Sequence, residues 1–593
     1  MKKFLISTPI KLTWPEAKNS ILVFTSESAI LSSQGNQNKY KKIIINDYRW
    51  SDKKILGDDI MYLDSFYEKI LTILSSRLNI IHSKNFSINF WRILIGPWLA
   101  TFLHIFFERW KNIENIKNKH NINKCIFLKL NENLFIPYDN EQFINLSQND
   151  LWNQFLYQKI IKKFLEDDKI ETKLFDENLQ NKEISHATSY FKNLKKNNFN
   201  FREVIFKLFN LFSFKRYRYF FYNTFLGFKN ELKLSIIFKQ SPIYFISDKS
   251  YHVEKTNKDL REGLKKNFNF EDRFEKTFTE ILSEQLPKLF LENFSDLDSF
   301  SKKTNIPQNP KIIFTSGALW YDTKISYHIG MLKESDCKLF YGQHGGAHGI
   351  SKYHWPESHE KIISDKYLSW GWSNDNHSKV QKFFILKNIN KKNIEKNNLL
   401  ITLKNRKRYF HSLESSSGTE LYSEFIKHVS HFLFGLKTKI KKKAVLRLPY
   451  KSLNPKDVDF FSNLENNFNF YSKDNIETAY NNARLIIHPS NSTPFLETIS
   501  LNLPSIVLLN KKNNPFRDTA EKYMDLLYRN NILFYDPKKA AELVNTIWDR
   551  DIENWWKEKK RQKAIRIFSE EFANKSDNLV LRLEDFFKKN ENL

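Results

Sequence analysis

The fold class is decided by one stretch, Asn482-Ala-Arg-Leu-Ile-Ile-His-Pro-Ser-Asn-Ser-Thr-Pro-Phe-Leu-Glu497, which continues to Asn502-Leu-Pro-Ser-Ile-Val-Leu508. The apolar run at 485–487 predicts a buried strand, and the polar residues 488–493 predict a turn. A helix is expected from Pro494, and a second apolar strand follows the Leu-Pro step. Strand, turn, helix and strand in this order indicate an α/β protein.

The turn at 488–493 has the composition of a phosphate site. A helix that begins there offers unpaired backbone N–H groups and the positive end of its dipole, and both favour an anion. Ordinary helix capping would also explain Ser492 and Thr493. The phosphate interpretation is favoured because five polar side chains crowd one turn, namely His488, Ser490, Asn491, Ser492 and Thr493.

Composition limits the classes of function. The chain has 593 residues, with 94 Lys and Arg against 67 Asp and Glu, which gives a formal charge of +27. A chain of this length is too long to fold around one hydrophobic core, so more than one domain is expected. The charge implies an anionic partner: nucleotide phosphates, an anionic lipid surface or nucleic acid. Cys125 and Cys337 are the only cysteines, so a disulfide framework is not expected. We expect a cytoplasmic protein without a signal peptide.

One segment, at 90–107, is nearly apolar enough to span a membrane. It contains Arg92 and His104, and a Gly96-Pro97 step divides it. We therefore predict a buried helix interrupted by a turn.

Strands and helices alternate over most of the chain, which predicts doubly wound parallel sheets. The Lys- and Asn-rich region 111–275 is expected to be a mostly helical insertion in the first domain. The predicted divisions are an N-terminal α/β acceptor domain at 1–110 and 276–373, a linker at 374–398, a nucleotide-donor domain at 399–545, and helices at 546–593 that pack back across the domains. Two facing Rossmann-like domains with a late phosphate turn are the layout of GT-B transferases.

Several motifs resemble a bacterial family of transferases from surface-polysaccharide gene clusters. They are Thr13-Trp-Pro-Glu16, Phe24-Thr-Ser-Glu27, Asp47-Tyr-Arg-Trp50, Asn89-Phe-Trp-Arg-Ile-Leu-Ile-Gly-Pro-Trp98, Tyr341-Gly-Gln-His-Gly-Gly-Ala-His-Gly349, Ser369-Trp-Gly-Trp372 and the opening stretch. The resemblance implies a transferase and leaves the substrate open. Region 111–275 matches poorly.

The opening stretch is also similar to the donor motif of GT-B capsule and lipopolysaccharide transferases that use CMP-activated acidic sugars, such as Kdo or sialic acid, or CDP-glycerol. That likeness implies phosphate binding by His488-Pro489, Ser490, Ser492 and Thr493, with Asn491 in the same turn. Glu497 would hold a ribose hydroxyl. As an alternative, Glu497 is a solvated acid favoured by the helix dipole.

The motif Gln343-His-Gly-Gly-Ala-His-Gly349 follows a predicted strand and is expected to line the ligand. Gly345 and Gly346 permit close backbone approach, and His344 can bind phosphate or transfer a proton. A metal site at His344 and His348 is less favoured, because the two glycines disfavour the helix that would align them. Hydrogen-bonded histidines in a glycine turn are the alternative.

Three more groups are candidates for the site. Arg447, near a strand end, could neutralise donor phosphates, or it could be a surface arginine. The run Lys404-Asn-Arg-Lys-Arg408 is a second phosphate clamp or a solvated loop. Glu27 is the first choice for the base that deprotonates the acceptor, as in Kdo transferases of this fold, although a plain turn carboxylate is as reasonable.

The predicted function is transfer of a sugar from a nucleotide-activated donor to a surface glycan or lipid-linked acceptor, without an obligatory metal or other cofactor. A CDP-glycerol-type polyol-phosphate transferase is the first alternative. A nucleic-acid-binding protein is a distant one, suggested by Phe214-Lys-Arg-Tyr-Arg-Tyr-Phe-Phe221. The 201–229 region could also dock to the anionic inner face of the cytoplasmic membrane.

Overall fold

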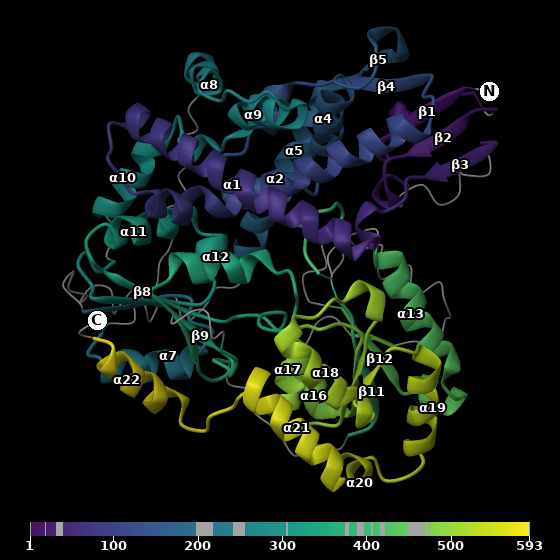
Figure 1. Ribbon diagram of the computed structural model, residues 1–593, viewed down its shortest axis with the longest axis vertical. Coiled ribbons are helices and arrows are strands. Elements are labelled where there is room, and N and C mark those ends of the chain that lie inside the picture. The colour runs from purple at the N-terminus through teal and green to yellow at the C-terminus, as the bar shows by residue number, and fades with distance from the viewer. Residues whose placement is uncertain are drawn as a thin grey trace.

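The computed structural model describes residues 2–17, 19–30, 40–196, 218–240, 255–303, 306–373, 379–387, 396–404, 407–415, 421–448, 469–471 and 475–591. Three parallel β-sheets follow one another along these residues, each surrounded by helices (Figure 1). The predicted α/β class with doubly wound parallel sheets in a GT-B-like arrangement is therefore confirmed. The number of sheets is three, where two were expected.

The first sheet has the strand order β3-β2-β1-β4-β5. Its strands are β1 (Lys3–Ile6), β2 (Ile21–Phe24), β3 (Lys42–Ile45), β4 (Lys124–Lys129) and β5 (Ile170–Leu174). The helices of this first domain are α1 (Lys53–His82), α2 (Ile88–Lys119), α3 (Asn140–Leu146), α4 (Asp150–Ile161), α5 (Glu177–Lys196), α8 (Lys258–Lys265), α9 (Arg273–Gln285) and α10 (Phe294–Lys303). The chain order reverses between β1 and β4, as in the Rossmann fold.

Helix α2 is the central helix of the first domain. It is long and apolar enough to cross a membrane, but the whole of its apolar window is buried inside the protein. The predicted buried helix is thus confirmed, whereas the predicted turn at Gly96-Pro97 is wrong, since the helix runs through Pro97. Gly96 lies against Tyr67 and His359, so a side chain at this position would collide with both.

The second sheet has the sequential order β10-β9-β8-β7-β6. Its strands are β6 (Tyr219–Phe221), β7 (Ile312–Thr315), β8 (Lys338–Gly342), β9 (Lys366–Ser369) and β10 (Val380–Lys382). Helices α7 (Phe228–Ile237), α11 (Thr323–Lys333) and α12 (Trp355–Ile363) belong to this second domain.

The third sheet has the order β13-β12-β11-β14-β15-β16. Its strands are β11 (Asn398–Thr402), β12 (Ala444–Arg447), β13 (Asn469–Tyr471), β14 (Ala483–His488), β15 (Ser505–Leu508) and β16 (Leu533–Phe534). The helices of this third domain are α13 (Leu421–Gly435), α14 (Thr438–Lys441), α16 (Ile476–Asn482), α17 (Thr493–Ser500), α18 (Asp518–Arg529), α19 (Pro537–Ile547), α20 (Ile552–Trp556) and α21 (Lys559–Phe572).

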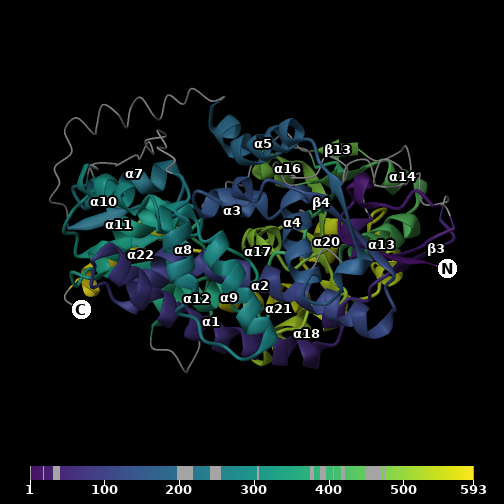
Figure 2. The ribbon, with the colours of Figure 1, turned by 90° about the horizontal axis from the view of Figure 1, so that it is seen from above.

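The last helix, α22 (Leu579–Lys589), leaves the third domain and packs on the second sheet (Figure 1). Its Leu583 and Phe587 are buried against Phe221, Phe314 and Phe340. Seen from above, α7, α10, α11 and α22 lie at one end of the molecule, and α13, α14 and β3 lie at the other (Figure 2). A C-terminal helix that returns to the preceding domain joins the second and third domains into one GT-B-like pair.

Two expected boundaries need correction. Region 111–275 is no separate helical insertion, because it supplies β4 and β5 to the first sheet and β6 to the second. Strand β5 has the mixed sequence Ile-Glu-Thr-Lys-Leu and β6 has three residues, so both are weak signals in the sequence. The expected linker 374–398 contains β10, which pairs with β9, and its residues 374–378 and 388–395 lie outside the described residues.

Candidate active site between the second and third sheets

The reversal point of the third sheet lies between β11 and β14, which are paired in parallel. In open parallel sheets ligands bind at such a point, beyond the carboxyl ends of the strands. Two segments begin there. One follows Thr402 at the end of β11, and the other is the turn 489–492, which follows β14 and leads into α17. The predicted phosphate turn therefore stands at the position where this fold binds a ligand.

His488 does not line that position. Its side chain is fully buried at the end of β14, between Thr402 Oγ1 at 2.8 Å from Nδ1 and Thr498 Oγ1 at 2.8 Å from Nε2. Burial lowers the pKa of His488 to about 3, so the ring is neutral. The predicted phosphate contact is wrong, because both ring nitrogens serve internal hydrogen bonds; Pro489, also buried, follows it into the turn.

The remaining polar residues of the turn, Ser490 to Thr493, are half-buried. Ser492 is the N-cap residue of α17, yet its side chain makes no capping hydrogen bond. It accepts instead from the Ser490 hydroxyl at 3.0 Å, and the buried Asn491 Oδ1 has no hydrogen-bond partner. Side-chain capping therefore does not account for Ser492, whose hydroxyl can still donate to a ligand.

The motif at 343–349 contacts this turn directly, although about 150 residues separate the two. Gly346 N donates to Thr493 Oγ1 at 3.2 Å. A Cβ atom at Gly346 would lie 2.4 Å from Ser492 C and 2.5 Å from Thr493 N. The glycine is required here because the loop after β8 lies against the backbone that begins α17.

Gln343 holds this loop and is not open to a ligand. The side chain is fully buried; its Oε1 accepts from Trp370 N at 2.9 Å and Trp372 Nε1 at 2.8 Å, and its Nε2 donates to Gly345 O at 2.8 Å. The predicted donor-binding role of Gln343 is therefore replaced by a positioning role, and Gly345 takes part in the same network through its carbonyl.

His344 and His348 converge on the buried carboxylate of Glu360, from α12. His344 Nδ1 lies 3.3 Å from Glu360 Oε1, and His348 Nε2 lies 3.2 Å from Oε2. Burial lowers the pKa of both histidines to about 4, and burial raises the pKa of Glu360. The side chain of His344 keeps 25 % of its surface exposed, whereas Glu360 has none. We call these three residues the His–Glu cluster.

Two lysines lie in the segment after β11. Surrounding protein lowers the pKa of Lys404 and of Lys407 to about 8. Lys407 nevertheless remains exposed, and Lys404 is half-buried. An anion beside either ammonium group would favour its charged form. Of the predicted clamp 404–408, residues 405 and 406 lie outside the described residues, and Arg408 pairs with Asp150 of α4 at 3.1 Å.

Glu497 and Arg447 lie deeper than expected. Glu497 is 1 % exposed and accepts from Lys387 Nζ at 2.6 Å and Tyr480 OH at 2.7 Å. It is thus neither a solvated acid nor open to a ribose. Arg447, at the end of β12, is 7 % exposed, which excludes the expected alternative of a surface arginine.

Glu27 lies in the first sheet and not in the sheet that faces the phosphate turn. It follows β2 and accepts from Ser423 Oγ of α13 at 2.7 Å. This contact joins the first and third domains. Glu27 therefore contacts the third domain through α13, and its role as the base stays a prediction.

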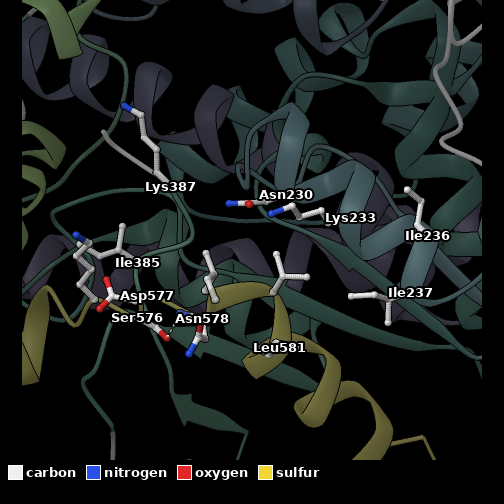
Figure 3. Close-up of a pocket in the computed structure, with 13 residues that line it drawn as sticks. Asn230, Lys233, Ile236, Ile237, Ile385, Lys387, Ser576, Asp577, Asn578 and Leu581 are labelled. Carbon is white, nitrogen blue, oxygen red and sulfur yellow. Dashed lines mark hydrogen bonds between the residues drawn. The ribbon is translucent and has the colours of Figure 1, made fainter. Parts of the chain in front are cut away.

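Lys387 borders a cavity of about 660 Å³ between α7 and the start of α22, shown in Figure 3. Lys233 and Lys575 also line it, together with isoleucine and leucine side chains. The cavity lies beside the connection that joins the second and third domains.

Sequence reasoning missed Glu360, Lys387 and Tyr480. No motif surrounds them, and each reaches its partner only through the tertiary fold. Tyr219, Phe220 and Phe221, from the run that suggested nucleic-acid binding, form the buried strand β6 and cannot stack on bases. Residues 201–217 of the proposed membrane-docking region lie outside the described residues.

Comparison with solved structures gives distant resemblances. A UDP-N-acetylglucosamine 2-epimerase from Listeria monocytogenes aligns with 63 % of this chain and 96 % of its own, at 12 % identity and a TM-score of 0.35. The wall teichoic acid polymerase TagF aligns with 70 % and 98 %, at 12 % identity and 0.31. WaaG, a glycosyltransferase of lipopolysaccharide biosynthesis, aligns with 50 % and 95 %, at 11 % identity and 0.25. We draw no inference about activity from resemblances this distant.

Comparison with curated proteins finds no match. The model of the LIC12162 family of transferases, in contrast, matches residues 3–587, which is nearly the whole chain. The match covers all three sheets and both motifs of the site, and it confirms the transferase class predicted from the sequence. The protein belongs to the LIC12162 family of transferases.

Proposed function

We propose that this transferase is a GT-B glycosyltransferase that moves a sugar from a nucleotide-activated donor to a surface glycan or a lipid-linked acceptor. One observation carries the proposal: the Gly346 loop of the second sheet contacts the 490–493 turn at the reversal point of the third. Two walls built from different sheets suit two substrates, one bound to each.

The donor phosphate is assigned to the third sheet. Backbone N–H groups at the start of α17 and the hydroxyls of Ser490 and Ser492 are the donors that this turn offers. Lys404 and Lys407 provide positive charge on the adjacent segment. Such groups stabilise the negative charge that develops on a departing nucleotide. In this proposal protein cations, and not a metal ion, neutralise the donor phosphates.

The acceptor is assigned to the second sheet. An acceptor hydroxyl must lose its proton as the nucleotide leaves, and the His–Glu cluster is the titratable group at the facing wall. His344 is its accessible member. An acceptor on a lipid carrier would hold the enzyme at the inner face of the cytoplasmic membrane, in keeping with the charge of +27.

Product analysis tests the proposal. The purified protein is incubated with CMP-, CDP-, UDP-, GDP- and dTDP-activated donors and a surface-glycan acceptor, and both products are identified by mass spectrometry. We expect one nucleotide to be released and a sugar without phosphorus to be added to the acceptor. Phosphorus retained in the product would identify a polyol-phosphate transferase instead. Release of no nucleotide from any donor would contradict both.

A further inference from the structure

The His–Glu cluster has an arrangement that hydrogen bonding alone does not explain. His348 Nδ1 lies 3.1 Å from Gly345 O, so Nδ1 carries the ring proton and donates it to this carbonyl. Nε2 of the same neutral ring then presents a lone pair to Glu360 Oε2, at 3.2 Å. Two lone pairs facing each other in a buried site repel unless a positive group lies between them.

His344 repeats this arrangement on the other carboxylate oxygen. Its Nδ1 lies 3.3 Å from Glu360 Oε1, yet the atom is buried and makes no hydrogen bond. A proton on Glu360 Oε2 would satisfy the contact with His348 Nε2, but His344 Nδ1 would still lack a hydrogen bond. One cation at the centre would satisfy both histidines and the carboxylate together.

The two nitrogen–oxygen distances agree with those of a tetrahedral metal site. Metal–nitrogen and metal–oxygen bonds of about 2.1 Å at a tetrahedral angle place neighbouring ligand atoms about 3.4 Å apart and two histidine ring centres about 5 Å apart. The two nitrogen–oxygen separations are 3.3 and 3.2 Å, and the ring centroids of His344 and His348 are 5.0 Å apart. All ligand atoms lie within 4.8 Å of one another.

Outer contacts fix the ligands as they do in known metal sites. Trp320 Nε1 donates to Glu360 Oε1 at 2.9 Å, and Tyr367 OH donates to Oε2 at 3.4 Å. The Gly345 carbonyl orients His348 through the nitrogen that does not face the cluster. Metal-binding histidines and carboxylates are held in this way by their second coordination sphere.

We propose that His344, His348 and Glu360 bind one divalent transition-metal cation, with Zn²⁺ as the best match to two nitrogens and a carboxylate. Three protein ligands leave one position open, as in catalytic zinc sites, and His344 keeps 25 % of its side-chain surface exposed. The sequence disfavoured a metal because Gly345 and Gly346 prevent a helix. The loop nevertheless brings both histidines to Glu360 without one.

A cation here would serve the transfer in a way that rests on the proposed function. A hydroxyl bound to a divalent metal loses its proton more easily, because the metal stabilises the alkoxide. The proton of the acceptor hydroxyl would pass to solvent or to the departing nucleotide, and the alkoxide oxygen would attack the donor sugar. The donor phosphates stay on the other wall and need no contact with this metal.

Metal binding is tested on the purified full chain. The protein is treated with a chelator, dialysed, and titrated with Zn²⁺ and with Co²⁺, and the bound metal is counted by inductively coupled plasma mass spectrometry. The same titrations are made with His348→Ala and Glu360→Gln. His328→Asn is the matched control, because His328 is a buried histidine of the second domain that hydrogen-bonds to Ser301 outside the cluster.

We expect the wild type and the His328→Asn variant to bind about one equivalent, with the visible absorption bands of tetrahedral Co²⁺, and to melt at a higher temperature with metal. His348→Ala and Glu360→Gln should lose at least tenfold in affinity and lack the bands. The inference is overturned if wild type binds less than about 0.1 equivalent of metal, which is the level of adventitious binding. It is also overturned if the Co²⁺-treated wild type shows no bands of tetrahedral Co²⁺. It is also overturned if both cluster variants bind metal like wild type.

Nucleotide binding by the chelator-treated wild type separates the two proposals. If that protein binds nucleotide but no metal, the metal site alone fails. If it binds metal but no nucleotide, the donor site fails and the metal site stands.

Discussion

Gly346 N donates a hydrogen bond to Thr493 Oγ1 at 3.2 Å, and this contact brings the second sheet to the start of α17 in the third. A side chain at position 346 would collide with the backbone of Ser492 and Thr493, which cannot turn aside as a flexible side chain could. The substitution Gly346→Ala should therefore separate the two walls of the site. We expect transferase activity to fall at least tenfold, about 1.4 kcal/mol of barrier, while far-ultraviolet circular dichroism stays unchanged.

The control for this variant is Gly263→Ala. Gly263 lies in helix α8, and a Cβ atom there would meet nothing within 4 Å. Alanine is the better helix former, so this change should leave activity intact and stabilise the protein slightly. Equal activity in both variants would show that the contact between Gly346 and Thr493 has no role in transfer.

Donor affinity should fall as pH rises through 8. Surrounding protein lowers the pKa of Lys407 to about 8 in the free enzyme, so about nine-tenths of this lysine is charged at pH 7 and about one-tenth at pH 9. Isothermal titration with the donor nucleotide should show up to tenfold weaker binding at pH 9. Lys407→Arg should remove most of this dependence, because arginine stays charged. A pH profile identical in wild type and Lys407→Arg would exclude Lys407 from the donor site.

Acid stability should depend on Glu357. Burial disfavours its ionised form, but Arg517 and Lys361 outweigh burial and lower the pKa of this carboxyl to about 2 from an ordinary 4.5. The unfolded state then binds the proton more readily, so the stabilisation is complete above pH 4.5 and is lost as the pH falls toward 2. Arg517 lies in the third domain, so the ion pair also joins that domain to α12.

The Glu357→Gln variant measures this contribution. Its melting temperature should lie below that of wild type at pH 7, and the difference should shrink as the pH is lowered to 3. A difference that stays constant from pH 7 to pH 3 would show that the charge of Glu357 is not what stabilises the protein.

Phe410 joins the segment after β11 to the first domain. Its ring stacks on Trp50 with centroids 5.6 Å apart, and it is 2 % exposed. Phe410→Ala should lower the free energy of unfolding by about 3–5 kcal/mol, the usual cost of a large buried aromatic residue. Tyr528→Ala, at a side chain 46 % exposed, should change it by less than about 0.5 kcal/mol. Denaturant unfolding of both variants compares them, and equal stability would mean that the segment is not anchored by Phe410.

The turn at 488–493 was predictable because its signals are local. An apolar run, a polar turn and a proline at the start of α17 are contiguous, and the structure has β14, the turn and α17 in these positions. The role of His488 was not predictable in the same way. Whether its ring points toward a ligand or into the core depends on Thr402 and Thr498, and Thr402 belongs to another strand.

The number of domains was misjudged for a related reason. Strands β4 and β5 lie in a Lys- and Asn-rich region. Strand β4 joins the first sheet by pairing with β1, more than 100 positions earlier, and β5 joins it through β4. Glu27 was consequently placed in one domain with the Gly346 loop, although the two belong to different sheets. Glu360 shows the same limit, since only the fold of α12 against the loop after β8 brings it to His344.

The central claim is that a donor phosphate binds where the 490–493 turn enters α17. Isothermal titration of CMP, CDP, UDP, GDP and dTDP into wild type and into a Ser490→Ala, Ser492→Ala double variant tests it most directly. We predict that at least one nucleotide binds wild type and that the double variant binds it at least tenfold more weakly. Binding of every nucleotide with equal affinity to both proteins, or to neither, would contradict the claim.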